Sequence, residues 1–307
     1  ATEDFTASAA VPTYTAGAFE ITWNGATQHL RVTHRADPDH VVWESVPGEP
    51  FVAAGIGQAT ITDSRASFSI SDDRRMLCSQ QQVDAIEAQG DSVQIRGSLT
   101  CEDGQSAGYV LLFTADQPNA LHFDLRTDRA DINRLYLTYG SPRDEHLMGF
   151  GVQYSFVDMK GRYLPIFVQE QGIGRGAQPI TFGANLQAGA GGEWHDSYAP
   201  VPYYLTSQRR AFFLWNYEYS AFDMRQPDRI QVQVFSGEMS GELLYGDSLN
   251  ALVETYTGLI GRMPALPEWI TSGAIVGMQG GTDRVREVYA QLQEYEVPVS
   301  AFWLQDW

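Results

Sequence analysis

The segment 273–303 reads GAIVGMQGGTDRVREVYAQLQEYEVPVSAFW, and it decides the fold class of the carboxyl-terminal part of the chain. Its continuous apolar run at 273–278 is typical of a strand that is buried on both faces of a parallel sheet, and 299–303 is predicted to form a second buried strand. The stretch between them has apolar residues at helical spacing, namely Val285, Val288, Tyr289 and Leu292. Strand, helix and strand in this order predict one βαβ unit, from which parallel sheets and (β/α)8 barrels are built.

The chain before this unit reads as a succession of short strands. Residues 19–23 alternate apolar and polar side chains, Asn24-Gly25 favours a type I′ turn, and the alternation resumes at 29–32. Similar runs follow at 67–70, 92–95, 108–113, 122–125, 135–139, 211–215 and 230–235. Many short strands joined by turn-forming residues predict a mainly β fold with a large antiparallel β-sandwich.

A helix and a linker are predicted between the two parts. Apolar residues recur with helical spacing over 249–260, and two prolines follow. We therefore predict a β-sandwich at 1–246, a helix and linker at 247–270, and the start of a catalytic barrel at 271–307. A whole barrel needs about 250 residues, so we expect the rest of it to lie beyond residue 307.

Composition and charge exclude several classes of partner. The 307 residues carry a net charge of −18, which disfavours a nucleic acid because phosphate binding needs clustered Lys and Arg. No apolar run of eighteen residues or more occurs, so we expect no membrane-spanning helix. The chain has no cofactor fingerprint and no Cys or His spacing typical of a metal site. We expect no cofactor and no metal, and a homo-oligomer stays open.

The two cysteines bear on the cellular compartment. Cys78 and Cys101 each lie in a predicted strand, and either a disulfide or two buried thiols fits this placement. The chain opens at Ala1 without an initiator Met, which fits either cleavage of a signal peptide or a start within a longer chain. These features favour a periplasmic or secreted protein, with a cytoplasmic protein as the alternative.

Six short motifs follow one another in order along the chain. They are GFGVQY at 149–154, FVQEQGIGRG at 167–176, PYYL at 202–205, YTGLIGRMPALPEW at 256–269, MQGGT at 278–282 and WLQDW at 303–307. Together they resemble glycoside hydrolase family 31 and in particular its bacterial sulfoquinovosidase branch. Before residue 149 only the β-rich character of the chain agrees with the family.

The resemblance implies a galactose-mutarotase-like sandwich followed by a (β/α)8 barrel, and a retaining α-glycoside hydrolase that uses two aspartates. One aspartate attacks the anomeric carbon, and the other protonates the leaving oxygen and then activates water. In the family both lie on later barrel strands, so we expect them beyond Trp307 and assign neither role to a residue here. Asp306 lies at the carboxyl end of a predicted strand, but the family does not use this position as its nucleophile.

Gln305 carries the prediction about the substrate. In α-glucosidases of the family the matching residue is usually an aspartate that accepts hydrogen bonds from sugar hydroxyls. A sulfoquinovosyl group has an anionic sulfonate at C6, which a carboxylate would repel and an amide would not. The alternatives are a neutral substitution in an ordinary glucosidase and a structural amide.

Two further residues are candidates for substrate binding. Glu170 matches an acidic residue that in related glucosidases bonds sugar hydroxyls; alternatively it pairs with Arg175 and fixes its loop. Gln279 is predicted either to line the floor of the pocket or to bond backbone at the barrel mouth. Arg175 is read mainly as a structural residue, although its guanidinium also suits an anionic substrate. His195 and Asp196 are interpreted as part of a solvent-exposed loop.

The resemblance thus predicts an exo-acting enzyme that releases sulfoquinovose from a small glycoside, either sulfoquinovosyl glycerol or a lipid head group. One alternative is an α-glucosidase or α-xylosidase of the same family. Another is a carbohydrate-binding, mutarotase-like sandwich without hydrolytic activity, which would account for residues 1–245 but not for the βαβ unit. Residues 1–307 by themselves are expected to be inactive.

Overall fold

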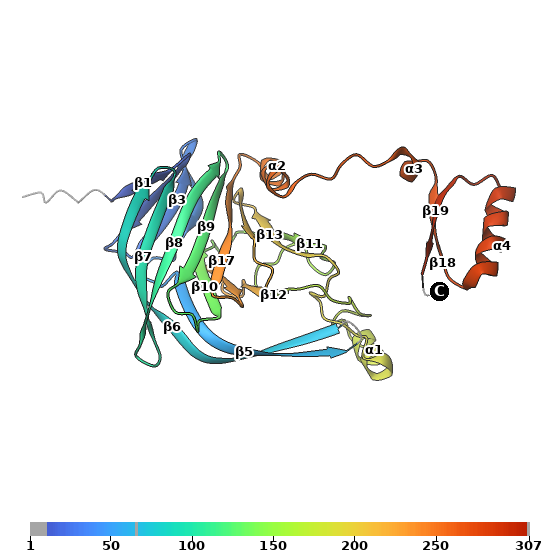
Figure 1. The fold of residues 1–307 in the computed structure, drawn as a ribbon, viewed down its shortest axis with the longest axis horizontal. Helices are drawn as coiled ribbons and strands as arrows, with labels where there is room; N and C mark the ends of the chain where they lie inside the picture. Colours follow the sequence, from blue (N-terminus) through green and yellow to red (C-terminus); the bar gives the residue numbers. More distant parts are fainter. Residues whose placement is uncertain (1–10, 65–66, 306–307) are drawn as a thin grey trace, which may run out of the picture. The chain divides into compact units, whose positions relative to one another are not determined.

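The computed structural model describes residues 11–64 and 67–305 (Figure 1). It divides into two compact units, Ala1–Tyr256 and Thr257–Trp307. The division falls inside the segment 247–270, which the sequence analysis assigned to a helix and a linker. Each unit is described by itself below.

The first unit begins with a small antiparallel sheet of four strands in the order β1-β2-β3-β4. The predicted hairpin at Asn24-Gly25 joins β2 to β3, with Trp23 opposite Leu30. Its inward side chains are apolar, and Phe19, Ile21, Leu30 and Val32 are fully buried. The strands are β1 (Thr13–Ala16), β2 (Phe19–Asn24), β3 (His29–His34) and β4 (Asp37–Glu44).

The remaining strands of this unit form one large sheet in which all neighbours pair antiparallel, in the order β11-β13-β14-β17-β9-β8-β7-β6-β5-β10-β16-β15-β12. The mainly β, antiparallel fold predicted from the alternating runs is therefore confirmed. The strands are β5 (Val52–Ser64), β6 (Ser67–Gln89), β7 (Ser92–Cys101), β8 (Ser106–Gln117), β9 (Ala120–Thr127), β10 (Arg134–Gly140), β11 (Leu147–Gly151), β12 (Tyr163–Ile166), β13 (Pro200–Thr206), β14 (Arg210–Leu214), β15 (Ser220–Asp223), β16 (Arg229–Val234) and β17 (Glu238–Tyr245).

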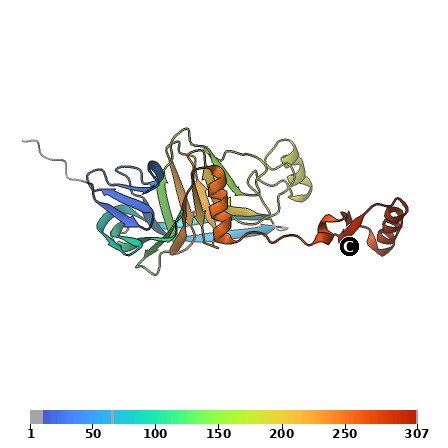
Figure 2. The same cartoon turned by 90° about the horizontal axis from the view of Figure 1, so that it is seen from above.

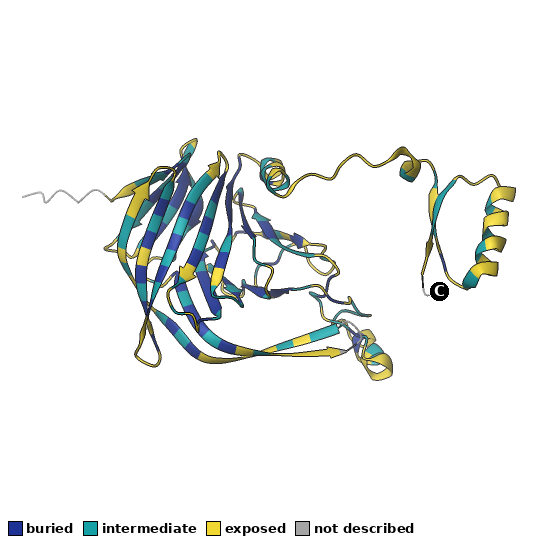
Figure 3. Cartoon of the chain, viewed as in Figure 1, coloured by how far each residue is buried: buried dark blue, intermediate teal, exposed yellow. Residues whose placement is uncertain are grey.

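Aromatic contacts show that the large sheet folds over on itself. Tyr139 of β10 stacks on Phe212 of β14 with ring centroids 5.5 Å apart. Phe150 of β11 contacts Phe222 of β15 at 5.1 Å, although these strands lie near opposite ends of the sheet order. Figure 3 shows buried and more exposed residues alternating along β7, β8 and β9, whereas β14 is buried throughout. The core thus lies between two layers, as a sandwich requires.

Strands β5 and β6 form a long hairpin that extends beyond this core (Figure 1). Its basal half is buried, with Val52, Ala54 and Cys78 fully enclosed, whereas Ile61 near the tip is 64% exposed. The distal half therefore serves as a wall for surface cavities rather than as core.

The cysteines face each other on neighbouring strands. Cys78 of β6 is the register partner of Cys101 of β7, and the two are joined by a disulfide. The structure thus contains the first of the two arrangements that the sequence left open.

Helix α2 (Leu249–Ile260) lies across strands of the first unit (Figure 2). Ser248 caps its first turn, because its hydroxyl accepts a hydrogen bond from the Ala251 amide at 3.2 Å. Tyr256 stacks on Tyr203 of β13 with centroids 3.8 Å apart, and Leu252 is fully buried.

The second unit contains the predicted βαβ arrangement, with α3 (Glu268–Thr271), β18 (Ala274–Met278), α4 (Gly281–Glu294) and β19 (Val299–Leu304). Strands β18 and β19 pair parallel, with Met278 opposite Leu304. Helix α4 packs on them through Tyr289, whose ring is 5.9 Å from that of Phe302.

The predicted burial of these two strands on both faces is wrong for the described residues. Ile275 is 50% exposed and Trp303 is 66% exposed, because within this unit only α4 and α3 lie near the two strands. The apolar runs therefore indicated the correct elements, but this unit by itself does not cover them.

Candidate functional site

A single loop, 167–199, joins β12 to β13 and carries Glu170. Its two limbs run side by side, because the Ile173 amide donates to the Ala190 carbonyl at 2.6 Å and the Arg175 amide to that of Gly191 at 3.0 Å. Gly172 has a φ of +71°, and a Cβ there would lie 2.5 Å from Gly192 Cα, so the close approach of the limbs requires glycine. The tip of the loop is helix α1 (Ile180–Ala188), which the sequence analysis did not predict.

Asp196 holds the base of this loop together. It is only 2% exposed and accepts hydrogen bonds from the Gln169 side-chain amide and, at 2.7 Å, from the Glu193 backbone amide. His195 Nδ1 lies 3.3 Å from the same carboxylate. The interpretation of Asp196 as part of a solvent-exposed loop is therefore wrong, because its carboxylate is the buried acceptor for donors from both limbs.

Arg175 closes the loop from the other side. Its guanidinium donates to the backbone carbonyls of Asp196 at 2.5 Å and Trp194 at 2.7 Å, and it lies 5.1 Å from the ring of Tyr154. Its bonds within the first unit are thus structural. None of these bonds reaches Glu170, so the pairing of Glu170 with Arg175 that the sequence left open is not the arrangement seen here.

Glu170 instead binds a phenol. The Tyr198 hydroxyl donates a hydrogen bond to the Glu170 carboxylate, and both residues are exposed. This hydrogen bond to an anion is the main reason why the pKa of Tyr198 is raised. The carboxylate keeps further lone pairs that can accept hydrogen bonds from sugar hydroxyls. The pair therefore presents an acceptor whose position is set by the loop.

A cavity of about 450 Å³ lies between this loop and the tip of the β5–β6 hairpin. Gln169 lines it and also accepts a hydrogen bond from the Phe68 amide at 3.1 Å, which ties the hairpin to the loop. Glu170 is not among the lining residues, so the adjacent residues Gln169 and Glu170 point to different surroundings. Other side chains in the lining include Asp63, Phe68, Ile70, Tyr163, Phe167, Asn185, Glu193, His195, Asp196 and Tyr219.

The other two candidates lie at one edge of the second unit. Gln279 follows β18 and Gln305 follows β19, and the Gln305 amide donates to the Met278 carbonyl at 3.0 Å. Because the strands are parallel, both glutamines stand at the carboxyl ends of the sheet, where barrel enzymes carry their chemistry. Both are exposed. Their amides can donate and accept hydrogen bonds without adding charge.

The structure brings Gln279 and Gln305 together at one edge of the second unit, and Glu170 belongs to the first unit. Asp306, the neighbouring acid in the sequence motif, lies outside the described residues. Sequence reasoning did not identify Tyr198, and it dismissed Asp196. The one available signal for Asp196 was its place in the Glu193-Trp194-His195-Asp196 run, which could not show which donors it meets.

Over residues 11–64 and 67–305, no group of three or more His, Cys, Asp or Glu side chains is arranged to hold a metal ion. None of the helices in these ranges has the length and apolar character needed to cross a membrane.

Curated proteins with similar sequences share one activity in their names. The chain is 28% identical over 281 residues to a sulfoquinovosidase of Escherichia coli strain K12, covering 91% of this chain and 39% of that protein. It is 30% identical over 293 residues to a sulfoquinovosidase of Agrobacterium fabrum, covering 94% of this chain and 41% of that protein. The resemblance predicted from the six motifs is thus confirmed, and the chain spans about two fifths of the length of these relatives. No family model matches the chain.

Solved structures agree on the fold. A family 31 sulfoquinovosidase from E. rectale, in complex with an aza-sugar inhibitor, superposes with a TM-score of 0.75 at 22% identity, covering 96% of this chain and 41% of that one. A cycloalternan-forming enzyme from Listeria monocytogenes, in complex with a pentasaccharide substrate, superposes with a TM-score of 0.57 at 12% identity, covering 99% of this chain and 36% of that one.

Proposed function

We propose that this chain is part of a retaining α-glycoside hydrolase that releases sulfoquinovose from small α-sulfoquinovosides. The observation that carries the proposal is similarity to two sulfoquinovosidases over 91% and 94% of this chain. The reaction would use two aspartates in a double displacement, and by the family resemblance both lie beyond residue 307. The described residues would supply the surroundings of the sugar rather than its nucleophile.

Gln305 supports the sulfonated substrate over a neutral one. Its place at the carboxyl end of β19, beside Gln279, is a place from which a barrel enzyme contacts substrate. Two unit charges 4 Å apart interact by about 4 kcal/mol at an effective dielectric constant of 20. A carboxylate in place of the Gln305 amide would therefore oppose binding of a C6 sulfonate by up to that amount, and a neutral glucoside would not be affected in this way.

Glu170 has a separate role in the proposal. Its carboxylate is oriented by Tyr198 and accepts hydrogen bonds, as a contact to uncharged sugar hydroxyls requires. We propose that it binds hydroxyl groups away from the sulfonate, because two anions in contact would repel each other.

The test compares 4-nitrophenyl α-sulfoquinovoside with 4-nitrophenyl α-glucoside on the full-length protein. We expect the wild type to prefer the sulfonated substrate. Glu at position 305 (Gln305→Glu) should lower kcat/KM for that substrate by about 100-fold or more, which corresponds to about 3 kcal/mol. The same substitution should change the value for the glucoside much less. A wild-type preference for the glucoside would support an α-glucosidase and refute the sulfosugar assignment.

The alternative without hydrolysis is a carbohydrate-binding sandwich. It accounts for the first unit, but not for the parallel βαβ unit with paired glutamines at its carboxyl edge. Hydrolysis by the full-length protein decides against it.

We propose a periplasmic or secreted location as well. The disulfide between Cys78 and Cys101 supports it, because such bonds persist in oxidising compartments. Fractionation of the native host, with alkylation of free thiols before lysis, tests this: recovery in the cytoplasmic fraction with both thiols alkylated would refute it.

A further inference from the structure

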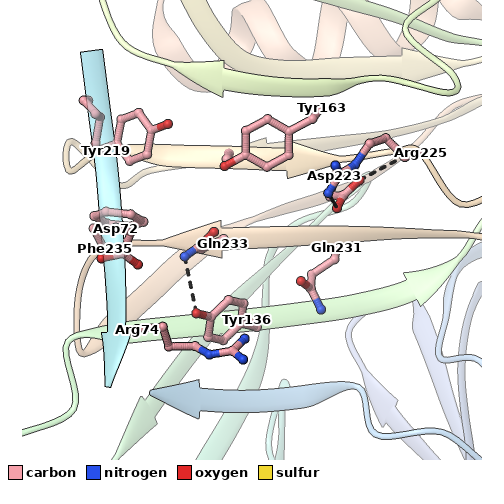
Figure 4. A pocket seen from close by; sticks show the side chains of 12 residues that line it. Asp72, Arg74, Tyr136, Tyr163, Tyr219, Asp223, Arg225, Gln231, Gln233 and Phe235 are labelled. Carbon is pink, nitrogen blue, oxygen red and sulfur yellow. Dashed lines mark hydrogen bonds and ion pairs between the residues drawn. The ribbon is translucent and has the colours of Figure 1, made fainter. Parts of the chain in front are cut away.

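A second cleft, of about 300 Å³, lies on the first unit over one end of the large sheet (Figure 4). Its floor follows the alternation of β16: Val232 and Val234 are fully buried in the core, whereas Gln231 and Gln233 line the cleft. Tyr136 of β10 contributes in the same way from the neighbouring strand. The sheet therefore presents a polar floor on the side opposite the core.

Strand β6 supplies one wall of this cleft. Ile70, Asp72 and Arg74 alternate along it, so all three side chains point to the same side of the strand. In Figure 4 this strand passes across the strands of the floor. Tyr163 and Tyr219 line the cleft from the other direction.

One positively charged side chain of the cleft is not balanced by an acidic partner. Asp72 accepts two hydrogen bonds from Arg134, at 3.1 and 2.7 Å. Asp223 accepts two from Arg225, at 2.9 and 2.6 Å. The Arg74 side chain, in contrast, forms no hydrogen bond or ion pair within residues 11–64 and 67–305, although its charge acts on the neighbouring Tyr136. The cleft thus carries one uncompensated positive charge on a chain whose net charge is −18.

The neutral side chains that line the cleft with Arg74 can donate and accept hydrogen bonds. Gln233 donates to the Tyr136 hydroxyl at 3.3 Å and keeps its amide oxygen as an acceptor. Burial raises the pKa of Tyr136, Tyr163 and Tyr219, so their hydroxyls remain protonated and can donate. A ligand in the cleft therefore meets donors, acceptors and aromatic rings beside a single guanidinium.

We propose that this cleft binds a monoanionic sugar, with the anionic group on Arg74 and the hydroxyl groups on Gln231, Gln233 and the tyrosines. Its volume is at the lower end of the range of ligand pockets, about 300–1,000 Å³, which suits one pyranose ring. An uncharged sugar would leave the guanidinium without a partner, and a polyanion would meet Asp72 and Asp223. Naming the sulfonated sugar as the natural ligand rests on the proposed function. The site itself is additional to the candidate active site.

The test uses the full-length protein with its active site filled by one equivalent of an aza-sugar inhibitor. Sulfoquinovose is then titrated, and saturation-transfer NMR measures the binding that remains. We expect saturable binding in the wild type, and binding about fivefold weaker in Arg74→Gln. Arg35→Gln is the matched control, because Arg35 is another exposed arginine of the same unit, 3.9 Å from Glu20. It should bind as the wild type does.

Two further measurements separate this inference from the proposed function. Glucose, which lacks the anion, should bind more weakly than sulfoquinovose and equally to the wild type and Arg74→Gln, whereas glucuronate should follow the pattern of sulfoquinovose. The value of kcat/KM for the aryl sulfoquinovoside should be the same in both proteins. Absence of residual binding in the inhibited wild type would overturn the inference. So would Arg74→Gln if it bound sulfoquinovose and glucuronate as tightly as the wild type does. If the wild type did not hydrolyse the aryl sulfoquinovoside, only the proposed function would be overturned. The glucuronate titration would still test whether the cleft binds a monoanionic sugar.

Discussion

Replacing Asp196 with alanine should open the loop that carries Glu170. The substitution removes a buried carboxylate that accepts hydrogen bonds from Gln169 and, at 2.7 Å, from the Glu193 amide, and that lies 3.3 Å from His195 Nδ1. A hydrogen bond to a charged group contributes about 1.5–3 kcal/mol, and bonds to one acceptor do not add fully. We therefore expect the closed loop to lose about 3–5 kcal/mol.

Hydrogen exchange measures this loss directly. The amides of Ile173 and Arg175 donate across the two limbs, so their protection reports loop closure. A loss of about 3 kcal/mol corresponds to exchange that is faster by about 100-fold, provided that closure limits exchange in the wild type. Glu193→Ala is the matched control, because the exposed Glu193 side chain makes none of these bonds, and its exchange should match the wild type.

The activity of the same variant connects the loop to the proposed reaction. If the closed loop positions Glu170, then kcat/KM of the full-length Asp196→Ala protein should fall while that of Glu193→Ala should not. Unchanged protection of Ile173 and Arg175 in Asp196→Ala would refute the structural reasoning. If Asp196→Asn restored the protection of these amides but not the activity, closure of the loop would not be what supports catalysis.

The remaining predictions concern stability. Burial alone would raise the pKa of Glu145, but two hydrogen bonds from Arg210 at 2.7 Å, and its charge, lower that pKa below the usual value. Glu145→Gln should therefore destabilise the folded state by about 3–5 kcal/mol at pH 7. The difference should shrink as the pH falls below about 4.5, because the wild type then loses the same charge. Urea unfolding at several pH values tests this, and a difference independent of pH would contradict it. Replacing Cys78 and Cys101 with serine should cost about 3 kcal/mol, from the 23-residue separation of the bonded positions; equal midpoints would contradict this.

The sandwich could be predicted because its strands follow simple alternation. In β16, Ile230, Val232 and Val234 point into the core and the residues between them point out, which is the pattern that the sequence shows. Helix α1 could not be predicted in this way. Its large apolar residues Phe182 and Leu186 are 66% and 78% exposed, and Thr181 is its one buried residue, so no apolar face gives a helical period.

The candidate site was predictable where it depends on strand ends. Gln279 and Gln305 follow two apolar runs, and parallel pairing then places them at one edge. Asp196 depends instead on the return of a loop, since Gln169 lies 27 residues away along the chain. Spacing in the sequence carries no signal for a contact of that kind, and the local run suggested a surface turn.

The cleft and the larger cavity beside it are not independent spaces. Ile70, Tyr163 and Tyr219 line both spaces and are therefore shared by them. A rotamer change of Tyr163 or Tyr219 would alter the shape of both spaces at once. A ligand that reorients one of these rings in the cleft would therefore change the larger cavity without any movement of the backbone.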